Sequence, residues 1–181
     1  IGSAAVAAPI LKIESDQLVG ATGVNVNGTL YDVQFKDGSC ISLFAGCNSN
    51  GDFFFTTDAG AIAASLALMD FVFINLYDDD PSKTFGIEIQ AFGRILTPYE
   101  QSLGNYVKAV GIINGGTGLP DFYALGEWPK DVDTSNDQST VYAVWSLTNV
   151  PEPATLALLG AGLLGFGVSR RKQFRKPASI Q

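Results

Sequence analysis

Residues 21–35 read ATGVNVNGTLYDVQF, and their pattern is the clearest fold signal in the chain. Val24 and Val26 alternate with polar neighbours, and the alternation resumes from Leu30 to Phe35. Asn27-Gly28 lies between the two runs, and Asn-Gly is preferred in type I′ turns, where both central residues need a positive φ. The stretch therefore predicts a β-hairpin near the N-terminus.

An alanine-rich segment over residues 58–80 follows the hairpin. Asp58 is a suitable helix cap, and large apolar side chains recur at helical spacing. These side chains are Ile62, Leu66, Met69 and Phe73. The segment resembles a membrane span, but Asp70 near its middle would cost roughly 2.5–3.5 kcal/mol in a bilayer. We expect a helix buried on most sides against a sheet.

Three later segments, at residues 85–92, 105–114 and 139–150, have the alternation or β-branched content of strands. No repeat and no Pro- or Ser-rich linker divides the body of the chain. The order of hairpin, helix and strands predicts an α+β fold for residues 8–149, as a single small domain. Its largely antiparallel β-sheet would pack on one main helix.

Charge and histidine content restrict the function. Residues 1–150 carry six basic and seventeen acidic side chains, a net charge of −11, so the body should be repelled by nucleic acid. The chain of 181 residues has no histidine, which excludes Ser-His-Asp and Cys-His catalysis and histidine-ligated metal sites. We therefore expect a protein that is not an enzyme and needs no cofactor.

The two cysteines, Cys40 and Cys47, are seven positions apart. In an exported protein they predict a disulfide that closes a short loop. By reducing the entropy of the unfolded chain, such a disulfide would stabilise the fold by about 2.5 kcal/mol. The alternative is two buried free thiols.

Two acidic clusters offer oxygen ligands to a cation such as Ca²⁺. They are Asp78, Asp79 and Asp80, and Asp131, Asp133 and Asp137. The first cluster would lie at a helix C-terminus, where the helix dipole disfavours carboxylates. The second lacks the turn glycine and the final glutamate of a calcium loop, so solvated surface turns are the simpler interpretation of both.

Other chemistry is weakly indicated. Asn114–Gly118 is rich in glycine but lacks the lysine and the helix of a phosphate loop, so we expect a turn. Four aromatic residues could form a sugar-stacking platform, although large aromatics more often pack in cores. They are Phe122, Tyr123, Trp128 and Trp145. A carboxylate pair for glycoside hydrolysis would be spaced in three dimensions and leaves no sequence mark.

Both ends of the chain suggest export. Residues 1–7 end in Ala5-Val6-Ala7, an A-x-A pattern that predicts the remnant of a signal peptide. Near the other end, Pro151 and Pro153 precede an uncharged apolar run, which predicts a short transmembrane helix over residues 154–169. Five cations follow within residues 170–176, beginning with Arg170, Arg171 and Lys172, and would stop the chain on the cytoplasmic side. Residues 177–181 form a tail.

Pro151-Glu152-Pro153, the apolar run and the basic cluster together resemble the PEP-CTERM sorting signal of Gram-negative bacteria, here at residues 150–176. The resemblance implies that Pro151, Glu152 and Pro153 are recognised by an exosortase, a membrane-embedded protease-like enzyme. It also implies transient membrane contact through residues 154–169, before transfer to the outer surface or extracellular polymer.

The expected function is therefore that of an exported, exosortase-sorted protein of the cell surface or biofilm matrix with a structural or interaction role. Extracellular polysaccharide is a candidate partner. The alternatives are a secreted carboxylate-dependent hydrolase acting on polysaccharide and a calcium- or glycan-binding module.

Overall fold

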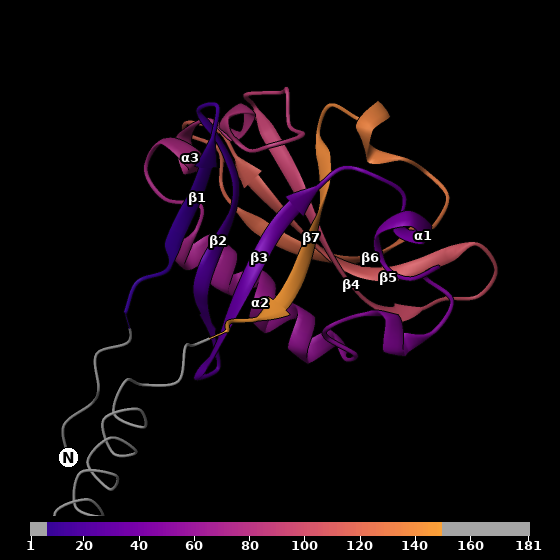
Figure 1. The fold of residues 1–181 in the computed structure, drawn as a ribbon. Coiled ribbons are helices and arrows are strands. Elements are labelled where there is room, and N and C mark those ends of the chain that lie inside the picture. The colour runs from indigo at the N-terminus through magenta and orange to yellow at the C-terminus, as the bar shows by residue number, and fades with distance from the viewer. Residues whose placement is uncertain (1–6, 150–181) are drawn as a thin grey trace, which may run out of the picture. The chain divides into compact units, whose positions relative to one another are not determined.

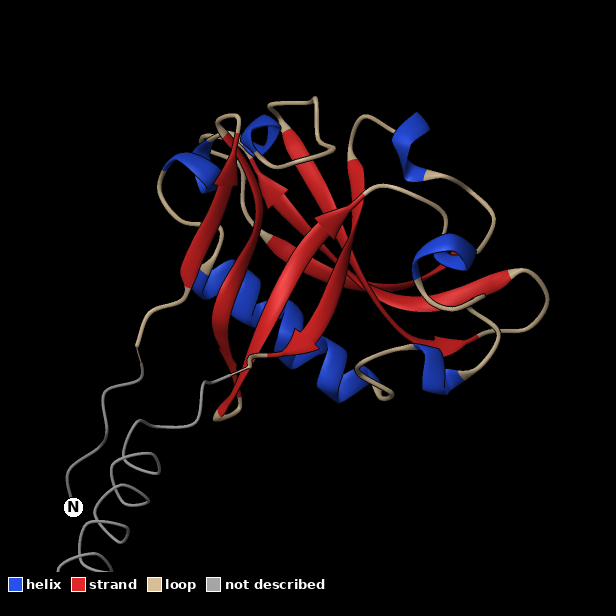
Figure 2. Cartoon of the chain, in the orientation of Figure 1, coloured by secondary structure: helices blue, strands red, loops and turns tan. Residues whose placement is uncertain are grey.

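The computed structural model describes residues 7–149, and these residues form a curved sheet that carries short helices (Figures 1 and 2). The strands are β1 (Ile10–Glu14), β2 (Gln17–Val26), β3 (Thr29–Lys36), β4 (Phe92–Gln101), β5 (Tyr106–Gly115), β6 (Phe122–Pro129) and β7 (Thr140–Leu147). The α-helices are α1 (Cys40–Leu43), α2 (Asp58–Phe71) and α3 (Leu76–Asp79). Three 3₁₀ turns are η1 (Asn50–Asp52), η2 (Pro81–Lys83) and η3 (Thr134–Asn136).

The predicted hairpin is confirmed as β2 and β3. Val26 pairs with Thr29, so Asn27 and Gly28 form a two-residue turn, with φ of 51° and 89°. Asn25 fixes this turn, because its side-chain oxygen accepts a hydrogen bond of 2.7 Å from the amide of Gly28. The local sequence is thus sufficient to set the register of these two strands.

The sheet has the order β1-β2-β3-β7-β4-β5-β6. All neighbouring strands are antiparallel except β4 and β7, which pair in parallel from Arg94 with Thr140 to Leu96 with Tyr142. The prediction of a largely antiparallel sheet is confirmed at this level. The parallel pair joins the N-terminal hairpin to β4–β6, because β7 returns from the end of the body to lie between β3 and β4.

The main helix, α2, differs in detail from the expectation. Its N-cap is Thr57 and not Asp58, because the Thr57 hydroxyl accepts the hydrogen bond from the amide of Gly60. The helix ends at Phe71, so Phe73 lies beyond it, and Asn75 then adopts a φ of 54° before α3 begins. A single helix from Asp58 to the acidic cluster at residues 78–80 is therefore wrong, since Asn75 at a positive φ lies between α2 and α3.

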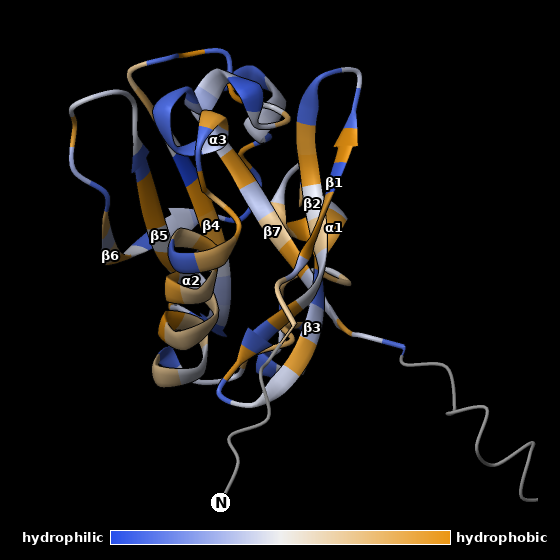
Figure 3. Ribbon diagram, turned by 90° about the vertical axis from the view of Figure 1, so that its left-hand side faces the viewer, coloured by the Kyte–Doolittle hydropathy of each residue, from blue (hydrophilic) through white to orange (hydrophobic). Residues whose placement is uncertain are grey.

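The most buried face of α2 consists mainly of small residues together with Leu68, and the predicted Ile62, Leu66 and Met69 are not part of it. Ala61, Ala64 and Leu68 are fully buried, whereas Leu66 is 37% exposed. The helix packs against β5, β2 and β4, although β2 and β5 are separated by three other strands in the sheet. The sheet therefore curves around α2, which lies behind β2 and β3 in Figure 1 and alongside β4 and β5 in Figure 3.

Alternate residues of the central strands face two different cores. Ile95 and Val141 belong to the core beside α2, whereas their neighbours Leu96 and Tyr142 belong to a second core. The second core is covered by the segment that contains α1 and the two cysteines. Successive strand residues point to opposite faces, so the sheet is buried on both sides in its centre.

The predicted strand at residues 85–92 is wrong except at its last residue. Residues 85–91 form a turn and an extended loop, and β4 begins only at Phe92. The alternation there arises because Ile87 is buried beside Gly93, whereas Glu88 is exposed and its amide donates to the carbonyl of Gln138. A loop packed on the sheet can thus have the same alternation as a strand.

Strands 105–114 and 139–150 are confirmed as β5 and β7, with slightly different ends. Within residues 7–149 no helix has the length and apolar character needed to cross a bilayer. The predicted sorting helix at residues 154–169 and residues 1–6 of the predicted signal remnant at residues 1–7 lie outside the described residues.

Candidate functional site

The two cysteines form the predicted disulfide. Cys40 and Cys47 are bonded and both side chains are fully buried. Ser39 caps α1 at the start of the loop, and the loop turns back through Ala45, Gly46 and Cys47, all at positive φ. The crosslink thereby holds an irregular segment against the second core.

The first acidic cluster is divided between two elements. Asp78 and Asp79 lie in α3, while Asp80 caps η2 by accepting hydrogen bonds from the amide and hydroxyl of Ser82, at 3.1 and 2.6 Å. The expected position at the C-terminus of a long helix is therefore wrong, because α2 has already ended at Phe71.

The second cluster caps local turns. Asp133 accepts a hydrogen bond from the amide of Ser135, and hydrogen bonds from that residue lower the pKa of Asp133. Burial tends to raise the pKa of Asp137, but hydrogen bonds from Ser139 and Thr140 and the charge of Arg94 outweigh it, so this pKa is lowered. In the described part of the chain no three acidic or cysteine side chains converge as a metal site would require.

The four aromatic residues do not form the sugar-stacking platform that the sequence left open. Trp145 is buried in the core beside α2, and Trp128 packs against the second core. Phe122 and Tyr123 are exposed, but they are consecutive residues of β6 and so point to opposite faces of the sheet. The four rings therefore do not share a surface on which one sugar could stack.

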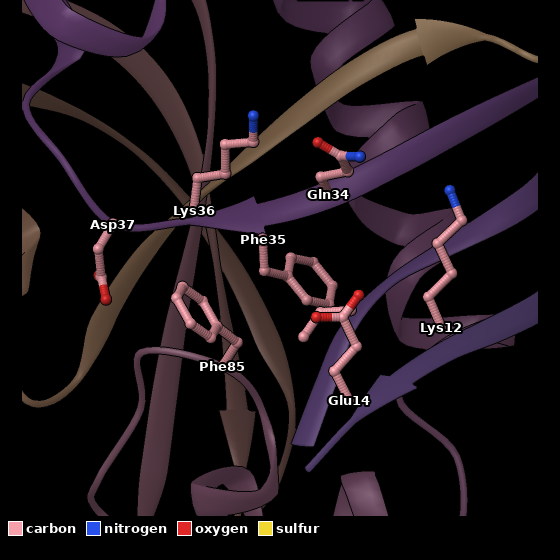
Figure 4. Close-up of a pocket in the computed structure, with 8 residues that line it drawn as sticks. Lys12, Glu14, Gln34, Phe35, Lys36, Asp37 and Phe85 are labelled. Carbon is pink, nitrogen blue, oxygen red and sulfur yellow. The ribbon is translucent and has the colours of Figure 1, made fainter. Parts of the chain in front are cut away.

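A different group of side chains lines a cleft of about 370 Å³ near β1 and β3 (Figure 4). Its polar lining consists of Lys12, Glu14, Gln34, Lys36 and Asp37, and its apolar lining consists of Val19, Phe35 and Phe85. Glu14, Gln34, Lys36 and Phe85 are exposed, so the cleft opens to solvent. Volumes of about 300–1,000 Å³ are typical of small-ligand sites.

Strand register sets the spacing across the cleft. Lys12 pairs with Gly20, and Gly20 pairs with Gln34, so the three residues form one row across β1, β2 and β3. Paired residues point to the same face, which puts Lys12 and Gln34 about 10 Å apart across two strand spacings. Gly20 contributes no side chain between them, and a Cβ there would lie 2.1 Å from the carbonyl oxygen of Val33.

Asp37 is held rigidly at one side of the cleft. The hydroxyl of Thr134, which is only 5% exposed, donates to Asp37 at 3.1 Å. Gly86 packs so closely that a Cβ there would lie 2.7–2.8 Å from both Asp37 oxygens. Burial raises the pKa of Asp37 above its usual value, and although the bond from Thr134 opposes this, nearby Asp133, Asp137 and Glu88 add to the rise.

Phe85 is positioned by its own backbone. Its amide donates to the carbonyl of Leu18 in β2 at 3.0 Å, and Thr84 forms an isolated parallel bridge with Leu18. The next residue, Gly86, has a φ of 76°, which allows the sharp turn after the ring. Figure 4 shows the ring of Phe85 between Asp37 and the side chains of Phe35 and Glu14.

No motif in the sequence indicated a site at this cleft. Gln34 and Lys36 are two apart on a strand and so share a face, which is a detectable signal. Phe85 could not be assigned to the same site, because its position depends on a loop contact with β2 that has no local sequence mark.

Comparison with protein families concerns the other end of the chain. Residues 149–172 match the family model described as the PEP-CTERM protein-sorting motif. The chain therefore carries a PEP-CTERM protein-sorting motif. The matched range contains the predicted recognition residues Pro151, Glu152 and Pro153 and the basic residues Arg170, Arg171 and Lys172. No curated protein and no solved structure matches the chain significantly.

The PEP-CTERM motif implies that this protein is exported, processed at the membrane by an exosortase, and then associated with the surface. The motif extends beyond the described residues, so the roles of its individual side chains stay predictions. It carries no information on the cleft, which belongs to residues 12–85 of the body.

Proposed function

We propose that this PEP-CTERM protein is sorted by an exosortase to the outer surface or extracellular matrix of a Gram-negative bacterium, where its body acts by interaction and not by catalysis. The precursor would be held in the inner membrane by residues 154–169 and cut near Pro151-Glu152-Pro153. The observation that carries the proposal is the match of residues 149–172 to the sorting motif.

Two properties of the body agree with an extracellular location. The disulfide between Cys40 and Cys47 is of a kind that persists in oxidising compartments. The net charge of −11 over residues 1–150 contrasts with +4 over residues 151–181, as expected if the basic end stays on the cytoplasmic side.

The non-enzymatic role is supported by the chemistry available in the cleft. The chain has no histidine, and the cleft offers two carboxylates, two ammonium groups, an amide and two phenyl rings. Within this cleft a carboxylate-dependent hydrolase would use Glu14 and Asp37, and the raised pKa of Asp37 favours this alternative.

The sorting proposal is tested by replacing Pro151, Glu152 and Pro153 together with alanine. The chain should be expressed behind a secretion signal in a Gram-negative host that has an exosortase. We expect the variant to accumulate uncut in the inner-membrane fraction, whereas the unaltered chain is trimmed and reaches the surface or the medium.

A matched control replaces Ser179, Ile180 and Gln181 with alanine, because these residues lie in the same terminal region but beyond the matched motif. The control should be trimmed normally. Normal trimming and surface delivery of the Pro151–Pro153 variant would show that the tripeptide is not the recognition element.

A further inference from the structure

We propose that the cleft formed by Lys12, Glu14, Gln34, Lys36, Asp37 and Phe85 binds a neutral hexose unit of an extracellular polysaccharide. The biological setting of this inference rests on the proposed function, which brings the body into contact with such polymers. The binding itself is a property of the cleft and can be measured without export.

The hydrogen-bonding groups of the cleft suit a ligand with many hydroxyls. Ionised Glu14 and Asp37 only accept hydrogen bonds, Lys12 and Lys36 only donate them, and Gln34 does both. Each sugar hydroxyl can donate and accept, so one pyranose ring can satisfy all three kinds of group. Phe85, which is 36% exposed, offers an apolar face to the C–H groups of the ring.

Charge favours a neutral sugar over other ligands. The two lysines and two carboxylates cancel, and the body around them carries a net charge of −11. A uronate polymer would be repelled by this body and by Glu14 and Asp37. A metal cation would be repelled by the lysines, neither of which forms an ion pair with a carboxylate in residues 7–149.

The cleft is preorganised, which reduces the entropy lost on binding. A hydrogen bond from the Thr134 hydroxyl restrains Asp37, and a hydrogen bond from the amide of Phe85 to the carbonyl of Leu18 fixes the backbone of Phe85. The row of Lys12, Gly20 and Gln34 is part of the sheet and cannot shift without breaking strand pairing. Because the cleft opens to solvent, the neighbouring sugar units of a polymer could continue out of it.

The test is titration calorimetry of the purified full chain with cellohexaose, maltohexaose and mannohexaose, and with hexagalacturonate as the polyanionic comparison. We expect saturable binding of at least one neutral hexasaccharide and at least tenfold weaker binding of hexagalacturonate. Phe85→Ala should weaken binding of the neutral ligand at least tenfold, and Phe85→Tyr should preserve it because the ring is kept.

The chain offers a closely matched control in Phe92→Ala, since Phe92 is 37% exposed but lies outside this cleft. This variant should bind like the unaltered chain. Gln34→Ala is a second test, and it keeps the inference testable if Phe85→Ala disturbs folding. Gln34 is an exposed strand residue, so Gln34→Ala should weaken binding while preserving the fold. Gln90→Ala, at an exposed residue outside the cleft, is its control and should bind normally.

The inference is overturned if no neutral hexasaccharide binds, if hexagalacturonate binds more tightly, or if Phe85→Ala and Gln34→Ala both bind normally. These results would leave trimming and surface delivery unaffected, so they are separable from a failure of the sorting proposal. Release of reducing ends from the bound oligosaccharide, abolished by Asp37→Asn, would keep the cleft but replace the non-enzymatic role with hydrolysis.

Discussion

The two faces of the central sheet are covered in different ways. One face is covered by α2, which makes a close approach through Ala61, Ala64 and Leu68. The other is covered by an irregular segment whose Phe44 ring packs edge-on against both Phe53 and Tyr142, and burial there raises the pKa of Tyr142 to about 12. A regular helix satisfies its own backbone and needs only apolar contacts, whereas an irregular segment needs further restraints.

Those restraints are visible on the second face. The disulfide closes the segment, and backbone hydrogen bonds tie Ile41 to Lys130 and Gly38 to Thr134. The helical face should therefore depend mainly on apolar burial, and the loop face mainly on the crosslink and its anchoring groups. This difference can be tested on each face separately.

The largest effect is expected on the helical face. Leu68→Ala should lower the free energy of unfolding by about 3 kcal/mol, because it leaves a cavity at a fully buried position. Urea denaturation measures the change. Leu66→Ala is the matched control on the same helix, and at 37% exposure it should cost less than about 1 kcal/mol. Equal losses in the two variants would mean that the face of α2 that contains Leu68 is not the more deeply buried one.

A smaller effect is expected from removing the crosslink on the loop face. Replacing both Cys40 and Cys47 with alanine should cost about 2.5 kcal/mol from loop entropy alone. Urea denaturation with and without reductant measures this, and reductant should destabilise the unaltered chain while leaving the double variant unchanged. If reductant does not change the stability of the unaltered chain, the disulfide does not stabilise the fold.

The smallest effect concerns Asp37, which precedes the crosslinked segment. Its folded-state pKa is raised, first by burial and then by Asp133, Asp137 and Glu88. The protonated form is therefore the one that suits the fold, so its favourable contribution is complete at pH below the unfolded value of 3.8 and is lost as pH rises through the folded pKa. Asp37→Asn mimics that form and keeps an oxygen that can accept from Thr134.

Asp37→Asn should accordingly raise stability at pH 7 by less than about 0.5 kcal/mol, because solvent screens this partly buried group, and the gain should shrink toward pH 3. Thermal melting over this pH range is the measurement. Asp131→Asn removes the same charge at an exposed position and controls for the net charge of the body. A gain that is the same at both pH values, or equal in the control, would assign the effect to net charge and not to the surroundings of Asp37.

Local patterns predicted those parts of the fold in which nearby residues decide the conformation. Asn27-Gly28 was sufficient for the hairpin, and continuous β-branched runs were sufficient for β5 and β7. The sequence did not reveal β4, because it carries Gly93 and Pro98, and Pro98 is accommodated at an irregularity in the register with β5. Nor did it reveal β6, which is an edge strand with exposed residues on both faces and no alternation.

The same distinction applies to the functional residues. Cys40 and Cys47 lie close in sequence, so their pairing could be inferred, and the sorting motif is a continuous segment that can be recognised without a fold. The cleft combines β1, β3 and a loop near residue 85, and its members are spread over more than seventy positions. The loop is held there by its backbone contacts with Leu18 of β2.

By itself, the sequence determined the hairpin, the short disulfide loop and the sorting signal, because each depends on residues a few positions apart. Only the tertiary structure decided which side of α2 is buried, that β7 pairs in parallel with β4, and that Phe85 lies beside Asp37. These features depend on contacts between distant segments, whose energies come from burial and backbone pairing that no local pattern encodes.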